Sequence, residues 1–423
     1  MSWVERKHVR LPDFSLNAGV LDGFDVVFQL DFESFAELNF QGSTIKFSKI
    51  LGLGADDEMV ARAGTELSSL KGWLDEQSDL VFGYFSYDLK NDLEKLTSSN
   101  SDSIGFPAFN LVVPQHLLVY CEQDGWHCFS HGEFSPGSGQ RKLSRRNIGN
   151  PLTDISVHDY VHKVENLRQH IQFGDIYEVN YCVQHGFKDA VIDPFSLYNE
   201  LKQSSPAPFS CYVADRGKYL LSASPERFIQ KIGSRIVSQP IKGTNRRTSN
   251  NEVQKELLRT NAKEVSENVM ITDLVRNDLS KSARKGTVKV EELCGIYEFE
   301  HVNQMISTVS AEMRDDVHPL DVVLNAFPMG SMTGAPKIRA MKLIDQYEDF
   351  SRGLYSGAVG YFTPELDFDF NVVIRSILYN EEKKTVTFPT GGAITINSVP
   401  ELEYEECMLK AEAMRNVLLN HAK

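Results

Sequence analysis

The sequence predicts an α+β fold, because predicted strands and helices alternate irregularly and several predicted strands follow one another directly. A doubly wound parallel sheet requires stricter alternation and fits less well. Of the 423 residues, 41% are hydrophobic and 24% are charged, which is typical of a globular protein with a large core. The length alone leaves open whether the chain forms two or three domains or one intertwined unit.

The N-terminal part of the chain is predicted to be rich in strands. Residues 80–89 and 109–121 contain many β-branched and aromatic side chains, as strands usually do. Residues 131–151 combine proline, glycine, serine and a basic cluster, which indicates an exposed loop or linker. We therefore expect a strand-rich subdomain over 1–150, intertwined with a second region over 151–423.

Downstream of this linker the hydrophobic periodicity predicts both helices and strands. Apolar residues recur at helical spacing over 161–171 and alternate as in a strand over 177–183. Two long helices are predicted, one over much of 251–279 and the other over 400–419. Each of these helices carries two glutamates three residues apart, which therefore share one helix face.

These two acidic pairs are candidate metal ligands. Glu264 and Glu267 form the first pair, and Glu403 and Glu406 form the second. Four carboxylates on two helices suit Mg²⁺, which takes oxygen ligands and usually keeps several waters. The same spacing is common on solvated helix faces, so the pattern alone leaves both interpretations open.

Three glycine-rich stretches can let the backbone approach a ligand closely. They are PIKGT at 240–244, GSMTGAPK at 330–337 and TGGAIT at 390–395. Exposed N–H groups at such glycines can receive carboxylate oxygens, although each stretch can equally be a tight turn. GSMTGAPK lacks the GKS or GKT ending of a phosphate-binding loop, so a nucleotide site is not expected there.

Lys242 in PIKGT and Glu226 in SPERF are candidates for catalysis. A desolvated lysine can act as a nucleophile, and a carboxyl group with a raised pKa can protonate a departing hydroxyl. Each residue can also be an ordinary surface charge, and the pattern alone does not decide between these interpretations.

Net charge and cysteine usage argue against several classes of protein. The formal net charge of −14 argues against surfaces that bind nucleic acid or anionic membranes, which need clustered lysine and arginine. The N-terminus does not resemble a signal peptide, and no stretch approaches the roughly 20 apolar residues that span a bilayer. We therefore expect a cytoplasmic protein. The six cysteines include no CxxC pair, which gives little support to a zinc site or a disulfide framework.

The motifs, taken together and in order, resemble those of the chorismate-utilising enzymes. The N-terminal third matches loosely, through GYFSYDL. The resemblance implies a large sandwich of two mainly antiparallel sheets with helices packed outside, and it makes 151–423 the chorismate-binding region. From about Val157 to the C-terminus the matching motifs are GDIYEVNY, SPERF, PIKGT, SENVMITDLVRNDL, GSMTGAPKIRAM, GLYSGAVGYF, NVVIRSI, TGGAIT and ELEYEECMLKAEAM.

At Lys242 the resemblance is to one branch of the family. Aminodeoxychorismate synthases generally carry PIKGT, whereas anthranilate synthases carry alanine in place of the lysine. In that branch the lysine adds to C2 of chorismate while an acid protonates the hydroxyl that leaves C4. Ammonia then attacks C4 and expels the lysine, which gives 4-amino-4-deoxychorismate on the route to 4-aminobenzoate and folate. By this resemblance Lys242 is the covalent nucleophile and Glu226 is the general acid.

The resemblance also implies a cofactor and a set of binding residues. Mg²⁺ in this family stabilises charge on the ring carboxylate of the substrate. The matching ligands of this ion are Glu267 and Glu406, and Glu264 and Glu403 would lie just behind them and reach the ion directly or through water. The second substrate carboxylate would be held by Arg375. The other pocket positions that match are Tyr355, Gly391, Gly392, Gly243, Thr244 and Thr333.

One position departs from the family pattern. Many members carry a histidine three residues before the serine of an HLxS motif, where QMIS places Gln304. This histidine is associated with pyruvate elimination by anthranilate synthases, so its absence agrees with a product that retains the enolpyruvyl group. The competing interpretations are anthranilate synthase component I, an isochorismate or salicylate synthase, and a non-catalytic chorismate-binding protein.

The expected reaction consumes ammonia, which implies a second subunit. None of the six cysteines lies in a GxCxG-type turn such as a glutamine amidotransferase needs. We therefore expect chorismate and a separate glutamine amidotransferase subunit as partners, and neither nucleic acid nor a membrane. The sequence does not indicate the oligomeric state, the affinity for this subunit, or whether tryptophan binds the N-terminal region.

Overall fold

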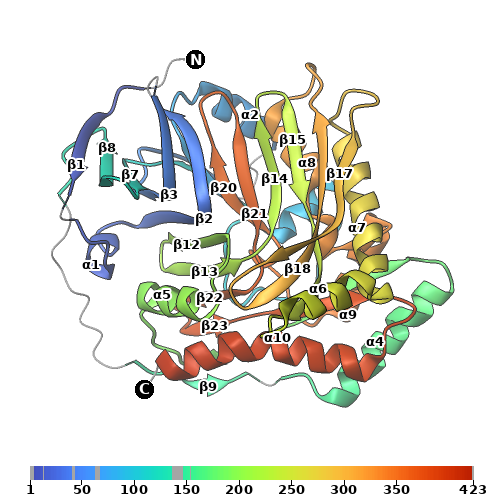
Figure 1. Cartoon of the computed structure of the whole chain (residues 1–423). Helices are drawn as coiled ribbons and strands as arrows, with labels where there is room; N and C mark the ends of the chain where they lie inside the picture. Colours follow the sequence, from blue (N-terminus) through green and yellow to red (C-terminus); the bar gives the residue numbers. More distant parts are fainter. Residues whose placement is uncertain are drawn as a thin grey trace.

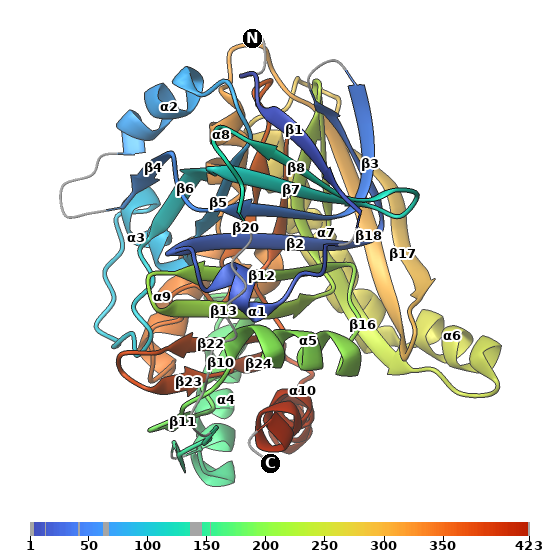
Figure 2. The same cartoon turned by 90° about the vertical axis from the view of Figure 1, so that its left-hand side faces the viewer.

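Two large β-sheets form the centre of the protein (Figures 1 and 2). The computed structural model describes residues 4–12, 14–40, 43–61, 67–135, 146–152 and 154–421. The first sheet has eleven strands, which are β1 (Lys7–Leu11), β2 (Val26–Phe40), β3 (Ser43–Leu53), β7 (His116–Cys121), β8 (Gly125–Ser130), β9 (Asn150–Pro151), β11 (Gly186–Lys188), β12 (Phe209–Asp215), β13 (Lys218–Ser224), β22 (Ser376–Asn380) and β23 (Thr385–Thr387).

The second sheet has ten strands, and a third small sheet has three. The second sheet contains β4 (Asp57–Val60), β5 (Val81–Phe85), β6 (Phe109–Val113), β14 (Arg227–Ile232), β15 (Arg235–Gln239), β16 (Ile241–Arg246), β17 (Lys289–Glu298), β18 (Val302–Glu312), β20 (Ala358–Phe362) and β21 (Phe368–Val372). The small sheet contains β10 (Glu178–Val183), β19 (Gly334–Ala335) and β24 (Thr390–Ile394).

Strand order shows that neither large sheet follows the order of the chain. The first sheet runs β1-β8-β7-β3-β2-β12-β13-β22-β23-β11-β9. The second runs β16-β18-β15-β14-β21-β20-β5-β6-β4, with β17 paired to β18. All pairings between these described strands are antiparallel. This confirms the predicted α+β sandwich of two mainly antiparallel sheets.

The main hydrophobic core lies between the two large sheets. Phe28 of β2 stacks on Phe82 of β5, with ring centroids 5.8 Å apart, and both side chains are buried. A polar contact also crosses the interface, because the hydroxyl of Tyr84 on β5 donates to Asp215 of β12 at 2.6 Å. Aromatic packing and a satisfied buried hydrogen bond therefore fix the two sheets against each other.

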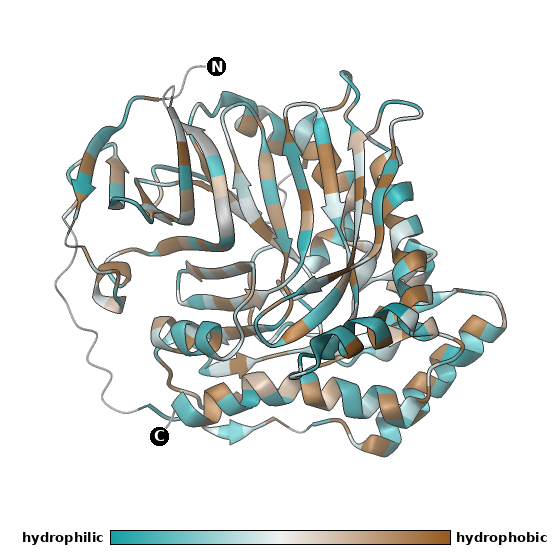
Figure 3. Cartoon of the chain, viewed as in Figure 1, coloured by the Kyte–Doolittle hydropathy of each residue, from teal (hydrophilic) through white to brown (hydrophobic). Residues whose placement is uncertain are grey.

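Helices pack on the outside of this sandwich, as predicted, mainly along the bottom and right in Figure 1. Buried residues of α5 and α10 pack on the first sheet, those of α7 and α8 extend the main core, and α4 and α9 pack around the small sheet. Apolar and polar residues alternate along the helices (Figure 3), as expected for helices that bury one face. The described helices are α1 (Ala18–Leu21), α2 (Leu67–Glu76), α3 (Lys90–Leu93), α4 (Val157–Gln172), α5 (Pro194–Ser204), α6 (Asn251–Thr260), α7 (Ala262–Ser280), α8 (Pro319–Ala326), α9 (Lys337–Tyr347) and α10 (Pro400–His421).

None of the described helices is long and apolar enough to cross a membrane.

Strands from 1–150 and from 151–423 stand side by side in both large sheets, since β2 pairs with β12 and β5 pairs with β20. Of the linker predicted over 131–151, residues 136–145 lie outside the described residues. The chain is therefore interwoven across this position.

The single long helix predicted over 251–279 is wrong, because the chain forms two helices there. Helix α6 ends at Thr260 and α7 begins at Ala262, with Asn261 between them in an extended conformation. The side chain of Asn261 accepts hydrogen bonds from the N–H groups of Lys263 and Glu264, at 3.0 and 3.3 Å. A new N-cap at this position starts a second helix that carries the first acidic pair.

We expect Asn261→Ala to lower the free energy of unfolding by about 1 kcal/mol, because two N–H groups at the start of α7 lose their acceptor. Urea denaturation measures this change. Asn250→Ala is the matched control, since Asn250 stands at the same position before α6 but makes no side-chain capping hydrogen bond. Equal effects of the two substitutions would contradict the capping role.

Candidate active site

A cavity of about 660 Å³ lies where β16, β24, α7 and α10 meet. Its volume falls in the usual range for small-molecule sites. Every site residue predicted from the sequence lines this cavity except Thr333. The residues brought together there are Glu226, Lys242, Gly243, Thr244, Glu264, Glu267, Tyr355, Arg375, Gly391, Gly392, Glu403 and Glu406.

A second cavity, of about 720 Å³, lies beside β14 and β21. Its buried charges are Lys231, which pairs with Asp367 at 2.7 Å, and Asp369, which accepts two parallel hydrogen bonds of 3.0 Å from Arg227. The charges in these pairs neutralise each other and leave no buried charge among the described residues of this cavity uncompensated for a ligand. The first cavity is therefore the better candidate for chemistry.

Lys242 reaches the cavity because β16 bulges at this point. The register with β18 shifts between Ile241 and Thr244, which inserts one extra residue in β16. Gly243 takes a φ of +97°, and a Cβ there would lie 3.2 Å from Glu264. A larger residue would therefore strain the backbone and crowd the carboxylate.

The amine of Lys242 is almost enclosed and stands among carboxylates. Its Nζ lies 3.4 Å from Oε1 of Glu178, and the side chain is 11% exposed. Burial lowers the pKa of Lys242, but attraction by Glu178, Glu267 and Glu226 outweighs it and raises the pKa above the ordinary value. The resting amine is therefore protonated, and it must lose a proton before it can attack a substrate.

Glu226 lies in the turn before β14 and is buried in the same cavity. Burial raises its pKa to about 7, against the opposing effects of the Ser331 hydroxyl and of Lys242. The hydroxyl of Ser331 donates to Oε1 of Glu226 at 2.7 Å and so orients the carboxyl group. A carboxyl group with this pKa can hold a proton at neutral pH and donate it, which suits a general acid.

Two glutamates project from α7 and two from α10. Glu267 and Glu403 are buried, Glu264 is partly buried, and the Glu406 side chain is 47% exposed. Burial raises the pKa of Glu267 to about 7, and burial together with the charge of Glu406 raises that of Glu264. Burial also acts to raise the pKa of Glu406, but Lys410 outweighs it and lowers that pKa, so Glu264 and Glu267 are the members whose burial is not offset by positive charge.

The donor set fits a hard divalent cation. Oε1 of Glu267 is buried and has no hydrogen-bond partner among the described residues. A cation among these oxygens would supply the missing partner and offset the repulsion between Glu264 and Glu406. Oxygen-only donors on two facing helices are suited to Mg²⁺.

Arg375 provides a cation for an anionic ligand. It lines the cavity, and no contact to a described residue satisfies its guanidinium. Burial lowers its pKa, which shows that the site leaves this charge poorly compensated. Tyr355 is buried in the same wall, with its hydroxyl 3.8 Å from Cys182. A ligand carboxylate would give the guanidinium the planar partner that it lacks.

Close packing of two strands explains one glycine of TGGAIT. Gly391 of β24 pairs with Cys182 of β10. A Cβ on Gly391 would lie 2.3 Å from the carbonyl oxygen of Tyr181, which no side chain can tolerate. Gly392 follows on the cavity side, where its Cβ would stand 3.7 Å from Glu403. Small residues here keep the floor of the cavity open.

Thr333 is the one predicted pocket residue that the structure does not place in the cavity. It is fully buried, and its hydroxyl donates to the carbonyl oxygen of Met329 at 3.1 Å. Its own carbonyl accepts from the N–H of Asn180 at 2.8 Å, and Asn180 lines the cavity. Thr333 therefore supports a lining residue from behind.

The family model described as chorismate binding enzyme matches residues 53–416. The chain belongs to the chorismate-binding enzymes. It is 29% identical over 398 residues to aminodeoxychorismate synthase component 1 of Bacillus subtilis, which covers 86% of this chain and 84% of the relative. It is 34% identical over 356 residues to anthranilate synthase component 1 of Thermus thermophilus, which covers 79% of this chain and 76% of the relative.

Solved structures show the same fold as this chorismate-binding enzyme. Anthranilate synthase component I from Streptococcus pneumoniae superposes with a TM-score of 0.72 at 21% identity, over 92% of this chain and 89% of that one. MenF, the menaquinone-specific isochorismate synthase from Escherichia coli, superposes with a TM-score of 0.77 at 16% identity, over 99% and 95%. The same fold therefore occurs in synthases that are named for different products.

Sequence reasoning missed several polar residues in and around this cavity. Lys263 lies 2.8 Å from Glu403, and Lys410 lies 2.7 Å from Glu406. Asn268 donates to the carbonyl of Lys242 at 3.2 Å and so holds the bulge of β16 against α7. Helical spacing signals Lys410, which follows Glu406 by four residues, whereas the other contacts join segments that are distant in sequence.

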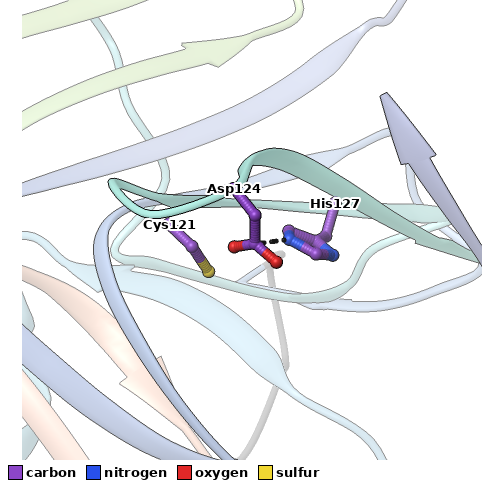
Figure 4. A group of neighbouring side chains, drawn as sticks. All are labelled: Cys121, Asp124 and His127. Atoms are coloured by element: carbon purple, nitrogen blue, oxygen red, sulfur yellow. Dashed lines mark ion pairs between the residues drawn. The ribbon is translucent and has the colours of Figure 1, made fainter. Parts of the chain in front are cut away.

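A second group of potential metal ligands lies outside this cavity, on the hairpin of β7 and β8 (Figure 4). Ligand atoms of Cys121, Asp124 and His127 lie within 4.8 Å of one another. Nε2 of His127 is 3.3 Å from Asp124, and Nδ1 is 3.0 Å from Nε2 of His8. These polar contacts account for the grouping, and all six cysteines are free thiols.

We expect Glu226→Gln to make unfolding less sensitive to alkaline pH. The folded carboxyl group has a pKa of about 7 against an ordinary value of 4.5, so its stabilising proton is lost as the pH rises through about 7. Between about pH 6 and about pH 8.5 this group should cost the wild type about 1.5 kcal/mol of unfolding free energy.

Urea denaturation at the two pH values measures the difference. The glutamine side chain can still accept from Ser331 but does not titrate, so the variant should lose less stability than the wild type. Glu405→Gln, on an exposed position of α10, serves as control. An unchanged pH dependence in Glu226→Gln would contradict the raised pKa.

Proposed function

We propose that the chain is the synthase component of an aminodeoxychorismate synthase, which converts chorismate and ammonia to 4-amino-4-deoxychorismate. The observation that carries this proposal is the enclosed amine of Lys242, which shares one cavity with Glu226 and the four glutamates. A primary amine is the nucleophile that a two-step displacement requires, and alanine at this position would not supply it.

The first half of the proposed reaction exchanges hydroxide for lysine. The ammonium of Lys242 first gives up a proton, for which the carboxylate of Glu178 at 3.4 Å is an adjacent acceptor. The free amine then attacks C2, the ring double bond shifts, and the C4–O bond breaks. Glu226 donates its proton to the departing oxygen, so that water leaves instead of hydroxide.

The second half exchanges lysine for ammonia. Ammonia attacks C4, the double bond shifts back, and the bond between C2 and Lys242 breaks to release the free amine. The new ammonium at C4 returns one proton to Glu226, and Lys242 recovers its own from Glu178. Each group therefore ends the cycle in its starting protonation state, and one difficult displacement is divided into two easier ones.

Substrate charge is distributed between two ends of the cavity. We propose that Glu267 and Glu406, supported by Glu264 and Glu403, hold Mg²⁺, which would supply positive charge to the ring carboxylate. Arg375, at the other wall, offers two parallel N–H donors to the second carboxylate. Both interactions would orient the ring so that C2 faces Lys242.

Anthranilate synthase component I is the second candidate, because relatives with that name are as similar to the chain as those named aminodeoxychorismate synthase. Both names designate component 1, so we further propose that a separate glutamine amidotransferase subunit supplies the ammonia. Isochorismate or salicylate formation would need water and no ammonia. A non-catalytic chorismate-binding protein would give no product at all.

With chorismate, Mg²⁺ and ammonium, we expect the wild type to form 4-amino-4-deoxychorismate, identified by mass spectrometry. Lys242→Ala should lower its formation by more than about 100-fold, because no nucleophile remains at C2, or redirect the chemistry toward anthranilate. Lys242→Arg keeps the positive charge without a nucleophilic amine, and it should be equally impaired. Unchanged formation in either variant would refute the covalent role, and anthranilate from the wild type would establish the second candidate.

We expect Glu267→Gln to weaken Mg²⁺ binding by at least about 10-fold, because a buried anionic ligand becomes neutral. Isothermal titration with Mg²⁺ measures the affinity directly, and the Mg²⁺ concentration for half-maximal turnover should rise in parallel. Glu405→Gln, on the exposed face of α10, is the matched control. Equal Mg²⁺ affinity in wild type and Glu267→Gln would rule out this residue as a ligand.

A further inference from the structure

Three apolar side chains are exposed on segments that meet at one end of the small sheet. Phe173 at the end of α4 is 81% exposed, Tyr177 just before β10 is 65% exposed, and Ile338 at the start of α9 is 45% exposed. Two aromatic rings in water within five residues of chain are costly for a surface loop. We call these three residues the aromatic patch.

Contacts between the flanking segments hold the aromatic patch in one place. The N–H of Tyr177 donates to the carbonyl of Ala335 at 2.6 Å, which ties the strand to the segment before α9. Asp175 accepts from Arg339 at 2.8 Å, and these two side chains are 39% and 41% exposed. An apolar centre with a charged rim is the usual anatomy of a protein–protein interface.

Strand β10 connects this patch directly to the reacting amine. Tyr177 points to the surface, and the next residue, Glu178, is 1% exposed and lies 3.4 Å from Nζ of Lys242. Oε2 of Glu178 is buried without a hydrogen-bond partner among the described residues, so this oxygen can accept a hydrogen bond near the amine. The patch is therefore separated from the site of amination by a single strand.

We propose that the aromatic patch is the docking surface for the glutamine amidotransferase subunit. This inference rests on the proposed function, which consumes ammonia that a second component must deliver. A partner seated on Phe173, Tyr177 and Ile338 would release ammonia one strand away from Lys242. The buried aromatic anchors would contribute most of the binding, as large apolar side chains do at interface centres.

The test compares two nitrogen sources in the full-length chain. The amidotransferase subunit of the same organism is purified separately and titrated into wild type, Phe173→Ala, Tyr177→Ala and Ile338→Ala. Turnover of chorismate is measured with glutamine plus this subunit and, separately, with ammonium alone. Ile232→Ala is the matched control, since Ile232 is 63% exposed at the end of β14.

Phe173→Ala and Tyr177→Ala should each raise the Kd for the subunit by at least about 10-fold. Glutamine-dependent turnover at limiting subunit should fall in proportion, whereas ammonium-dependent turnover should stay within about twofold of wild type. Retained ammonium turnover also shows that the variants fold. The Ile232→Ala control should leave both reactions unchanged.

Several outcomes would overturn the docking proposal. Undiminished affinity and glutamine-dependent turnover in the patch variants would do so, as would failure of the wild type to bind the subunit. A homodimer detected by sedimentation and dissociated by Phe173→Ala would assign the patch to a second copy of this chain instead. If the wild type binds the subunit but does not aminate chorismate with ammonium, the proposed function fails while the affinities still decide the docking surface.

Discussion

The site depends on one electrostatic constraint: a single enclosed amine stands among carboxylates that outnumber it. Burial favours the neutral form of each group, whereas attraction between Lys242 and its neighbours favours the charged forms. The balance keeps the amine protonated and raises the pKa of Glu226 to about 7. One shared environment thus sets the protonation of both groups, and the bulge at Gly243 and the support from Asn268 hold the amine where that environment acts.

Much of the fold could be predicted from hydrophobic periodicity, and the misses have physical reasons. Helices α4 and α10 and strand β10 follow the pattern because each buries apolar residues in a regular way. The break at Asn261 escapes the pattern because a polar cap interrupts a stretch with good helical spacing on both sides. Residues 109–121 have the composition of strands, and Pro114 divides them into β6 and β7. These two strands enter different sheets, which the pattern did not predict because local sequence does not specify pairing partners that are distant in the chain.

The site shows the same division between local and distant information. Spacing on one helix predicted both acidic pairs, and motif resemblance predicted the lysine and the acid that line the cavity with them. The counter-charges Lys263 and Glu178 were missed because each meets its partner across separate elements. Thr333 was placed in the pocket by resemblance, yet its hydroxyl satisfies a neighbouring carbonyl instead. Motifs therefore pointed to residues of the cavity, whereas the packing decides which of their atoms reach it.

The interwoven order of the strands has a consequence for how the protein is made. Strand β2 can pair with β12 only after residues 209–215 are synthesised, and β5 can pair with β20 only after residues 358–362 are synthesised. Since β22 and β23 of the first sheet come from residues 376–387 and β20 and β21 of the second come from 358–372, neither sheet can be completed until most of the polypeptide has left the ribosome. Such non-local pairing slows folding and leaves strand edges unpaired in the nascent chain. During synthesis this chain should therefore depend heavily on chaperones that shield those edges.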